Sequence, residues 1–497
     1  MGTIRYALAL FIGKIVELVL KITPFRDSDA PGSLALAICP DYLEYIAKPT
    51  KIVGVTGTNG KSTVVRLVSD CIRDTEIQVL NNAEGGNTPA GIATCLTRGV
   101  TLFGREKYGT AVLEIDAIYS KELLPVLEPD YLLVTLLARD SMERNGHPEY
   151  IRELINHYIP STTKLLLNAD DILSLTVAPN NRRKFFGLKD MGGEKKINTS
   201  LIDDGAACPI CHKKVSYEYN RYSNIGRAVC PSCGFTSPEY DYSGEIVHVG
   251  EEADGPIAQG PVPMIKVGTD KREETFPLIH DSVYNVYNEL AAIALMMEMG
   301  TRLMDIKKAM DKMSLSKSTY NSAQVGSIKV VSILAKDRDA YATSRAFEYI
   351  MSQPGYKEIL ILNNSLNASM DSSENCSWLY DCDFELLNSD KVDRVVVFGD
   401  RSKDYTLRLL MAGLRKDKIV EVPDYPDAAD ALQYMSNETI FILFGTDPVK
   451  VGKEVFDMVV ERIRAKEGLG NISTEEKKQP KVKALKPGKI KLGRKKR

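Results

Sequence analysis

The sequence has too few cysteines for a disulfide scaffold, since nine are spread unevenly over 497 residues and four of those fall in two CxxC pairs. This usage favours a reducing compartment, so we expect a cytoplasmic protein. Hydrophobic residues make up 44% of the chain, which is ample for sizeable cores, and the length predicts about three domains of roughly 150 residues. No internal repeat is apparent.

The sequence also lacks a long hydrophobic run. Its most apolar terminal stretch, residues 6–13, is followed by Lys14, Glu17 and Lys21 and by no small-residue cleavage site, so we expect neither a signal peptide nor a membrane span. Instead, large apolar residues recur there at helical spacing and predict an amphipathic helix: Ile4, Leu8, Phe11, Ile15 and Leu18. Such a helix either docks on the body of the protein or contacts a membrane surface.

Acidic residues outnumber basic ones outside the C-terminal end. The net charge is −2, yet the segment after Glu476 carries eleven Lys and Arg and no acid, so the rest of the chain stands at −13. An acidic body does not fit a protein whose main surface binds nucleic acid. We expect residues 467–497 to be a disordered basic tail, which is either simply solvated or contacts an anionic membrane or nucleic acid.

From Lys51 onward, short Val, Ile and Leu runs alternate with helical stretches, which is typical of a mostly parallel sheet covered on both faces. The pattern breaks over residues 205–245, which are rich in Cys, Tyr, Gly and Pro and suggest an inserted ribbon. Helical periodicity returns over 283–300, with Gly300 as the expected C-cap. A second alternation predicts a separate α/β domain over 316–466, with helices that include 406–414 and 427–435.

A glycine-rich loop joins the strand at 51–55 to the helix that follows. Glycines let the backbone turn tightly enough to point N–H groups at a phosphate, and the helix N-terminus adds partial positive charge. Lys61 would reach the β- and γ-phosphates, and the Ser62 hydroxyl would bind Mg²⁺. The spacing is the short TGTNGK[ST]T form, and the residues expected to bind ATP are Gly57, Thr58, Asn59, Gly60, Lys61, Ser62 and Thr63.

Glu114 ends a predicted strand in AVLEID, downstream of the loop. An acid at this place could complete a Mg²⁺ site or polarise its waters, although a carboxylate at a strand end can also be only a solvated terminus. Its position after a phosphate loop favours the metal role. Lys61 and Glu114 are therefore the catalytic candidates.

Two CxxC pairs separated by eighteen residues form the second strong motif: Cys208, Cys211, Cys230 and Cys233. Such pairs form knuckles whose thiolates approach one tetrahedral Zn²⁺, and two pairs complete the coordination. Because four sulfur ligands leave no open position for water, we expect a structural zinc. An iron site or a redox pair is the alternative.

Taken together, TGTNGKST, VLEID, LLNADD and YNVYNELAA resemble the central domain of the Mur ligases, and the cysteine ribbon is similar to that of the MurT-like branch. The resemblance covers about residues 40–466. It implies a helical N-terminal segment (1–50), a central P-loop ATPase domain (51–315) with the inserted zinc ribbon (205–245), and a Rossmann-like α/β C-terminal domain (316–466). These ligases phosphorylate a carboxylate with ATP and let an amine attack the acyl phosphate.

The resemblance also assigns roles to further polar residues. Asn285 should lie near the nucleotide base, although it could instead cap a helix. Asn168 and Asp171 should shape the nucleotide or metal side of the cleft, although such a turn can be purely structural. Asn87 and Asp140 should face the substrate, with an ordinary polar loop as the alternative.

The sequence departs from MurT at the place where MurT meets a glutaminase partner. MurT proteins carry an Asp in a DGxDxSW stretch that completes the partner's Cys-His pair, and Asn375 stands there in this chain. An amide cannot supply the charge that stabilises an imidazolium, so a glutaminase partner is doubtful unless Asp371 or Glu374 takes that role. The Asp-His pair of many Mur ligases is Asp140-Ser141 here.

The leading interpretation is an ATP-dependent peptide ligase that resembles those of archaeal pseudomurein synthesis. It would join an amino acid or ammonia to a nucleotide- or lipid-linked cell-wall peptide precursor. The first alternative is a MurT subunit that amidates glutamate in lipid-linked murein. The second is a nucleotide-binding scaffold without catalysis.

Overall fold

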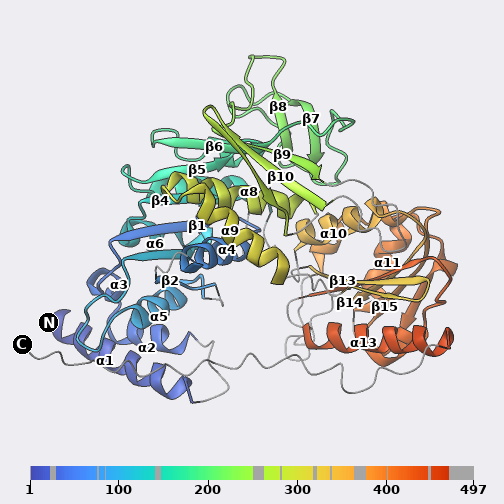
Figure 1. The fold of residues 1–497 in the computed structure, drawn as a ribbon, viewed down its shortest axis with the longest axis horizontal. Coiled ribbons are helices and arrows are strands. Elements are labelled where there is room, and N and C mark those ends of the chain that lie inside the picture. Colours follow the sequence, from blue (N-terminus) through green and yellow to red (C-terminus); the bar gives the residue numbers. More distant parts are fainter. Residues whose placement is uncertain are drawn as a thin grey trace, which may run out of the picture.

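The chain was analysed as a computed structural model that describes residues 2–22, 29–74, 78–83, 86–139, 147–249, 262–279, 282–316, 322–335, 339–362, 376–399, 401–445 and 449–468. Two α/β units, each built on its own sheet, lie side by side, and a small two-stranded ribbon projects from the first of them (Figure 1). Among the described residues, no helix is both long and apolar enough to cross a membrane.

Three helices precede the first sheet: α1 (Gly2–Leu20), α2 (Ala30–Ile38) and α3 (Tyr42–Tyr45). The predicted N-terminal helix exists, but it packs with the face opposite to the one its large apolar residues suggest. Ala9, Leu10 and Gly13 are buried, because small residues let α2 and α5 (Pro89–Gly99) approach closely. The expected apolar face is exposed to solvent.

The first sheet has nine strands in the order β11-β10-β9-β6-β5-β4-β1-β3-β2. Neighbouring strands pair in parallel, except that β10 is antiparallel to both β9 and β11, so the expected mostly parallel sheet is confirmed. The strands are β1 (Lys51–Thr56), β2 (Val79–Asn81), β3 (Thr110–Glu114), β4 (Tyr131–Val134), β5 (Lys164–Asn168), β6 (Arg183–Leu188), β9 (Tyr242–Val249), β10 (Val262–Thr269) and β11 (Arg272–Pro277).

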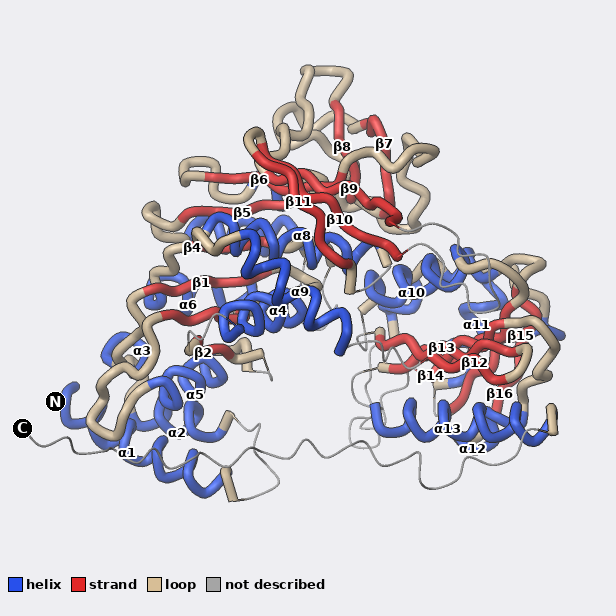
Figure 2. The backbone as a smooth tube through the Cα atoms, viewed as in Figure 1, coloured by secondary structure: helices blue, strands red, loops and turns tan. Residues whose placement is uncertain are grey.

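Helices cover both faces of this sheet (Figure 2) and create two separate cores. The two-sided burial explains why the central strands read as continuous apolar runs rather than as alternating patterns. One core includes residues of α5, α6 (Ser120–Leu127) and α7 (Pro148–Tyr158), and the other includes α4 (Lys61–Asp74), α8 (Val283–Glu298) and α9 (Leu303–Ser316). Short 3-10 helices follow β3 (Ala117–Tyr119) and β5 (Ser174–Thr176).

Helix α8 ends as the sequence predicts. Gly300 adopts a left-handed φ of +85°, its N–H donates to the Met297 carbonyl, and the Thr301 N–H donates to the Met296 carbonyl. These two hydrogen bonds, with a left-handed residue at the end of the helix, form the C-terminal capping arrangement in which glycine is favoured.

The ribbon consists of β7 (Ser216–Tyr222) and β8 (Ile225–Val229), which pair antiparallel. In the sequence it lies between β6 and β9, which are neighbouring strands of the main sheet. The second α/β unit has six strands in the order β12-β13-β17-β14-β15-β16, and only β12 runs antiparallel to its neighbour. Its strands are β12 (Ser322–Val325), β13 (Ile328–Leu334), β14 (Lys357–Leu362), β15 (Val392–Phe398), β16 (Ile419–Val422) and β17 (Thr439–Phe444).

Helices α10 (Ala340–Ser352), α11 (Ser402–Met411), α12 (Tyr425–Asp430) and α13 (Val449–Lys466) cover the second sheet, with 3-10 turns at Ser377–Asp381, Phe384–Leu387 and Lys416–Lys418. The helix predicted over 427–435 was wrong in extent, because α12 ends at Asp430. The backbone N–H groups of Gln433 and Tyr434 instead donate to the buried Glu358 carboxylate, and Tyr434 has a left-handed φ of +56°.

Candidate active site

The glycine-rich loop lies at the carboxyl end of β1, which sits between β3 and β4 in the sheet. Its backbone needs glycine at two points. Gly57 has φ +129°, and a Cβ there would lie 2.2 Å from the Thr135 Oγ1; Gly60 has φ +86°, and a Cβ there would lie 2.0 Å from the Asn288 Oδ1. The loop is therefore packed against the end of β4 and the first turns of α8, with no room for a side chain.

Lys61 is the first residue of α4 and is almost buried. Its Nζ donates to the carbonyls of Gly57 at 2.6 Å and Thr58 at 3.0 Å, so the ammonium lies inside the curl of the loop. The Thr58 hydroxyl donates to the Ala138 carbonyl and accepts from the Ala138 N–H, which ties the loop to the segment after β4. The loop is thus held in one shape with its cation at the centre.

The structure brings three predicted site residues together. The Ser62 hydroxyl donates to the Glu114 Oε2 at 2.6 Å, and the Asn87 Nδ2 donates to the Glu114 Oε1 at 2.8 Å. The Glu114 backbone is fixed by Asn82, whose side chain donates to the Glu114 carbonyl and accepts from its N–H. Asn82 was not among the predicted site residues.

These groups fit a nucleotide phosphate with Mg²⁺. The Ser62 hydroxyl and the Glu114 carboxylate supply oxygen ligands of the type that Mg²⁺ prefers. The two oxygens are 2.6 Å apart, next to the glycine-rich loop. The Asn59 Nδ2 is buried and has no hydrogen-bond partner among the described residues, so this donor awaits an acceptor beside the loop. Thr63, in the first turn of α4, is partly buried next to Ser62.

Asn285 lies in the first turn of α8 and donates from Nδ2 to the Ser282 Oγ at 2.9 Å, and its Oδ1 faces the Asn288 Nδ2 at 3.4 Å. Since Asn288 abuts Gly60, this turn of α8 is next to the phosphate loop. Ser282 occupies the N-cap position of α8, so Asn285 is not the capping residue; its side chain braces the first turn, and its place near a nucleotide base stays a prediction.

Asn168 and Asp171 are fully buried at the end of β5. The Asn168 Nδ2 donates to the Thr135 carbonyl. Asp171 accepts from the Leu137 N–H at 2.6 Å and from the Asn224 Nδ2 at 2.5 Å, as well as from Ser174 and Leu173. Burial raises the pKa of Asp171 to about 6. With all its acceptor positions occupied, Asp171 fits the structural alternative.

A buried network beside this turn was missed by the sequence analysis. The Arg221 guanidinium, on β7, donates to the Asp170 Oδ2 at 3.1 Å and to the Tyr287 hydroxyl at 2.7 Å, and it also donates to the carbonyls of Leu188 and Lys189. The Arg221 and Asp170 side chains are 2% and 0% exposed. The ribbon is therefore joined to α8 and to the β5 turn by a desolvated ion pair. Nothing in the sequence distinguishes Arg221 from other arginines.

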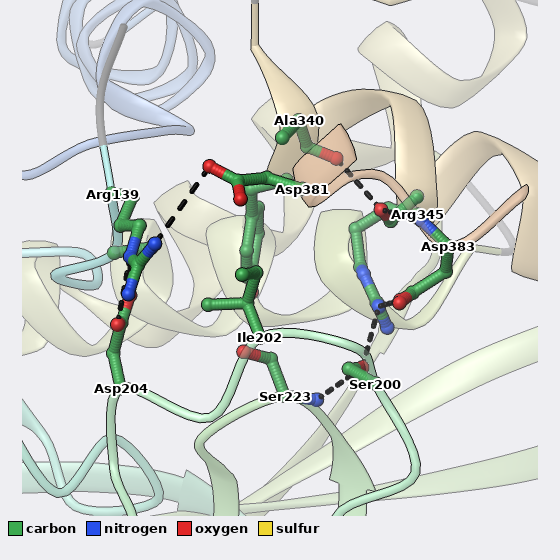
Figure 3. Close-up of a pocket in the computed structure, with 12 residues that line it drawn as sticks. Arg139, Ser200, Ile202, Asp204, Ser223, Ala340, Arg345, Asp381 and Asp383 are labelled. Carbon is green, nitrogen blue, oxygen red and sulfur yellow. Dashed lines mark hydrogen bonds and ion pairs between the residues drawn. The ribbon is translucent and has the colours of Figure 1, made fainter. Parts of the chain in front are cut away.

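The two α/β units meet at a small cavity of about 30 Å³ next to the segment that follows β4 (Figure 3). The Arg139 Nε donates to Asp204 at 2.9 Å, and its Nη1 lies 3.7 Å from the Asp381 Oδ2 of the second unit. Burial raises the pKa of Asp381, with Arg139 acting in the opposite direction. Asp140, predicted to face substrate, lies outside the described residues.

A second bridge crosses the same boundary. The Arg345 Nη2, on α10, lies 3.3 Å from the Ser200 Oγ and 3.4 Å from the Asp383 Oδ2, and its guanidinium stacks 4.5 Å over the Tyr222 ring of the ribbon. The Leu201 N–H donates to the Asp383 Oδ1 at 2.6 Å. The ribbon and its flanking segment thus contact the second unit directly. The glutaminase-contact residues Asp371, Glu374 and Asn375 fall outside the described part of the chain.

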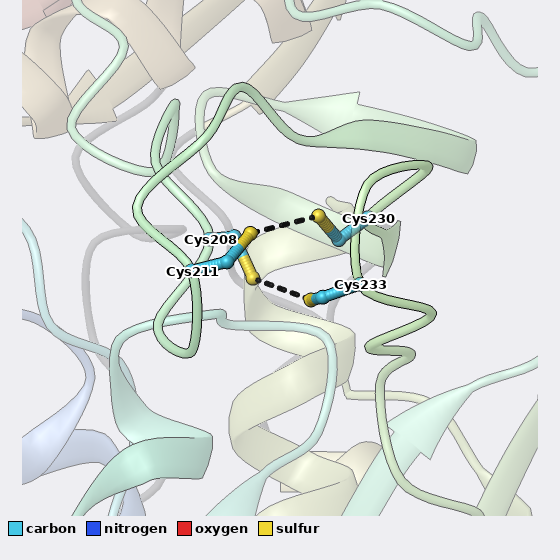
Figure 4. A group of neighbouring side chains, drawn as sticks. All are labelled: Cys208, Cys211, Cys230 and Cys233. Atoms are coloured by element: carbon cyan, nitrogen blue, oxygen red, sulfur yellow. Dashed lines mark hydrogen bonds between the residues drawn. The ribbon is translucent and has the colours of Figure 1, made fainter.

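The four predicted zinc ligands converge (Figure 4). Cys208 and Cys233 have their Sγ atoms 3.6 Å apart, those of Cys211 and Cys230 are 3.5 Å apart, and all four lie within 4.8 Å of one another. A tetrahedron with Zn–S bonds of about 2.3 Å requires S···S separations of roughly 3.8 Å, so the set fits zinc with no open position.

Comparisons with known proteins agree with this architecture. A family model described as MurT ligase C-terminal matches residues 338–445. The lipid II isoglutaminyl synthase (glutamine-hydrolyzing) subunit MurT of Streptococcus pneumoniae is 28% identical over 444 residues, covering 88% of this chain and 94% of that protein. The subunit of the same name from Staphylococcus aureus (strain COL) is 26% identical over 429 residues, covering 86% and 92%. A solved pseudomurein peptide ligase type C from Methanothermus fervidus matches with a TM-score of 0.61 at 17% identity, over 84% of this chain and 81% of that one.

The fold and the phosphate loop are of the Mur ligase type, that of ATP-dependent carbon–nitrogen ligases. Among them it is similar to MurT, since the MurT relatives match over nearly their whole length and the MurT C-terminal family model covers most of the second sheet.

Proposed function

We propose that this chain forms an amide bond by activating a carboxylate of a cell-wall peptide precursor with ATP and joining it to an amine. The observation that carries the proposal is the junction of the phosphate loop with Glu114, in which Ser62 and Glu114 lie 2.6 Å apart beside the Lys61 ammonium. A bound Mg²⁺ would offset charge on the phosphate oxygens.

The chain's own residues supply position and charge. Lys61 would exchange the carbonyls of Gly57 and Thr58 for phosphate oxygens and hold its cation against the transferring phosphoryl group. Asn87, which already orients Glu114, would keep that carboxylate turned toward Ser62. The acceptor carboxylate would then approach from the side of the second α/β unit, where Arg139 offers a cation at the boundary.

For the incoming amine, our leading proposal is an amino acid, as in a pseudomurein-type peptide ligase. It rests on Asn375, which stands where MurT proteins carry the acidic residue toward a glutaminase. Lys61, Ser62, Glu114 and the four-cysteine set would then serve ATP, Mg²⁺ and a structural zinc, and no partner subunit would be needed.

The second candidate is glutamine-dependent amidation, with ammonia delivered by a glutaminase. The two MurT subunits that match over 86% or more of this chain support it, because both are named as subunits of a glutamine-hydrolyzing synthase. In that case another acid near Asn375, such as Asp371 or Glu374, would have to face the partner.

The test incubates purified full-length protein with ATP, Mg²⁺ and nucleotide- or lipid-linked wall peptides, offering amino acids and ammonia together. Product masses and ADP release are read side by side. A mass gain of one amino-acid residue supports the leading proposal, and conversion of a carboxylate to a carboxamide supports the second candidate.

Variants locate the chemistry in the site. Lys61→Met and Glu114→Gln should abolish product formation, whereas Lys307→Met, on the outside of α9, should not change it. Turnover that survives Lys61→Met would contradict the role given to the phosphate loop, and the absence of both product and ADP release with every acceptor would contradict the ligase proposal and leave a nucleotide-binding scaffold.

A further inference from the structure

Helix α1 presents a row of large apolar side chains to solvent. We call this row the α1 stripe: Ile4, Leu8, Phe11, Ile15 and Leu18. Ile4 and Leu18 are 78% and 62% exposed, and the other three are 46–50% exposed. Five large apolar groups at one helical face are costly in water, so a row of this kind marks a contact surface rather than scattered surface residues.

The α1 stripe faces away from the protein. At 100° per residue, its members lie on the side of the helix opposite to Ala9 and Gly13, which pack on α2 and α5. In Figure 1, α1 lies at the end of the first unit farthest from the ribbon β7–β8. No described residue covers the stripe.

A neighbouring loop enlarges the apolar surface. Leu102 and Phe103 are 52% and 89% exposed at the tip of the turn between α5 and β3. This turn abuts α1, because a Cβ on Gly104 would lie 3.2 Å from the Tyr6 hydroxyl and 3.5 Å from Leu10. Two segments that are far apart in sequence thus bring exposed apolar groups to one end of the molecule.

Cations border this surface. Lys21 projects from one edge of the stripe, with its side chain 66% exposed, and it shares Glu17 with the mostly buried Lys14, at 2.9 Å each, so the three groups retain net positive charge. Lys107 stands close by: burial lowers its pKa, and the charges of Lys14 and Lys21 act in the same direction. Exposed Arg105 lies two residues before it.

We propose that the α1 stripe docks on the surface of an anionic lipid bilayer, with the apolar side chains in the acyl–headgroup boundary and Lys21 and Lys107 against the headgroups. The occupant follows from the charge. An apolar row edged with cations is complementary to an anionic bilayer, whereas residues 1–476 together carry −13, so this face is suited to such a surface and the acidic body as a whole is not. A second copy of the chain would bring the same lysines face to face.

The experiment is flotation of the full-length protein with vesicles of phosphatidylcholine, with and without phosphatidylglycerol, in the absence of ATP. Two double variants are compared: Leu8→Glu/Phe11→Glu on α1, and Leu407→Glu/Leu410→Glu, which has the same spacing and similar exposure on α11. A third, Lys21→Glu/Lys107→Glu, tests the cations. Circular dichroism confirms that all variants are folded.

We expect the wild type to float with the anionic vesicles, the α1 double variant to bind about a hundredfold more weakly, and the α11 control to match wild type. The lysine variant should lose about tenfold, and only on anionic vesicles. The proposal is overturned if the wild type does not float, if the α1 variant floats equally well, or if light scattering shows a dimer that Leu8→Glu/Phe11→Glu dissociates while no vesicle binding occurs.

Discussion

The Arg221 network allows a quantitative test of how the ribbon is attached. In Arg221→Met, the Asp170 carboxylate loses its only described cationic partner but keeps the Tyr287 hydroxyl, Tyr240 hydroxyl and Leu188 N–H as donors. Burial holds the pKa of Tyr287 well above its ordinary value, so the phenol stays protonated and keeps donating. The Leu188 carbonyl still accepts from the Tyr219 hydroxyl, so the loss comes from the uncompensated buried charge, which predicts about 4 kcal/mol less unfolding free energy.

The single tryptophan makes the assay specific. Trp378 lies in the second α/β unit and is 6% exposed, so its emission reports unfolding of that unit, whereas far-ultraviolet circular dichroism reports both. Arg221→Met should lower the first unit's transition by roughly 8 °C or more and leave the Trp378 transition nearly unchanged. Arg302→Met is the control, because Arg302 is solvent-exposed and its pair with Asp305 should contribute little to stability. Equal shifts for the two variants would refute the reasoning.

Three further predictions follow from named contacts. Gly60→Ala should weaken ATP binding at least tenfold by calorimetry, since its Cβ would overlap Asn288, whereas Gly192→Ala, with a similar φ and open space, should not. Glu438 has its pKa raised to about 8 by burial and by Glu358, so the native state holds a proton that the unfolded state loses above about pH 4.5. Its contribution to the free energy of unfolding therefore falls as pH rises from about 4.5 to 8. Glu438→Gln should flatten this dependence of stability on pH and, after allowance for solvent screening, add about 2 kcal/mol at pH 8 in urea titrations. An unchanged dependence on pH would contradict this prediction. Cys233→Ser should cut bound zinc to a small fraction of wild type by elemental analysis, and retained zinc would exclude the four-cysteine site.

The sequence predicted the fold class because its signals are local. The phosphate loop is contiguous with its strand and helix, and Glu114 follows the next strand in the sheet, so their meeting at one edge could be expected from topology. The cysteine knuckles are likewise read from spacing. Asn87 was placed only by resemblance, and its hydrogen bond to Glu114 is a property of the folded loop.

What could not be predicted depends on contacts across long sequence separations or on competition between faces. Arg221 meets Asp170 and Tyr287, 51 and 66 residues away, and no periodic pattern encodes that meeting. In α1, the pattern identified the large apolar residues but not the face that packs. The face that carries Ala9 and Gly13 packs against the neighbouring helices, because close contact between helices needs small side chains more than large apolar ones.

Because the ribbon lies between two paired strands in the sequence, deleting it affects the main sheet. Strands β6 and β9 are parallel neighbours, so the chain that leaves the end of β6 has to return along the length of the strands before β9 begins. In most α/β proteins a helix makes that return; here the cysteine-bearing segment makes it. Excising residues 189–241 would thus remove the whole connection between two adjacent strands, and a shortened protein would need a replacement connector of at least a dozen residues to keep β9, β10 and β11 on the sheet.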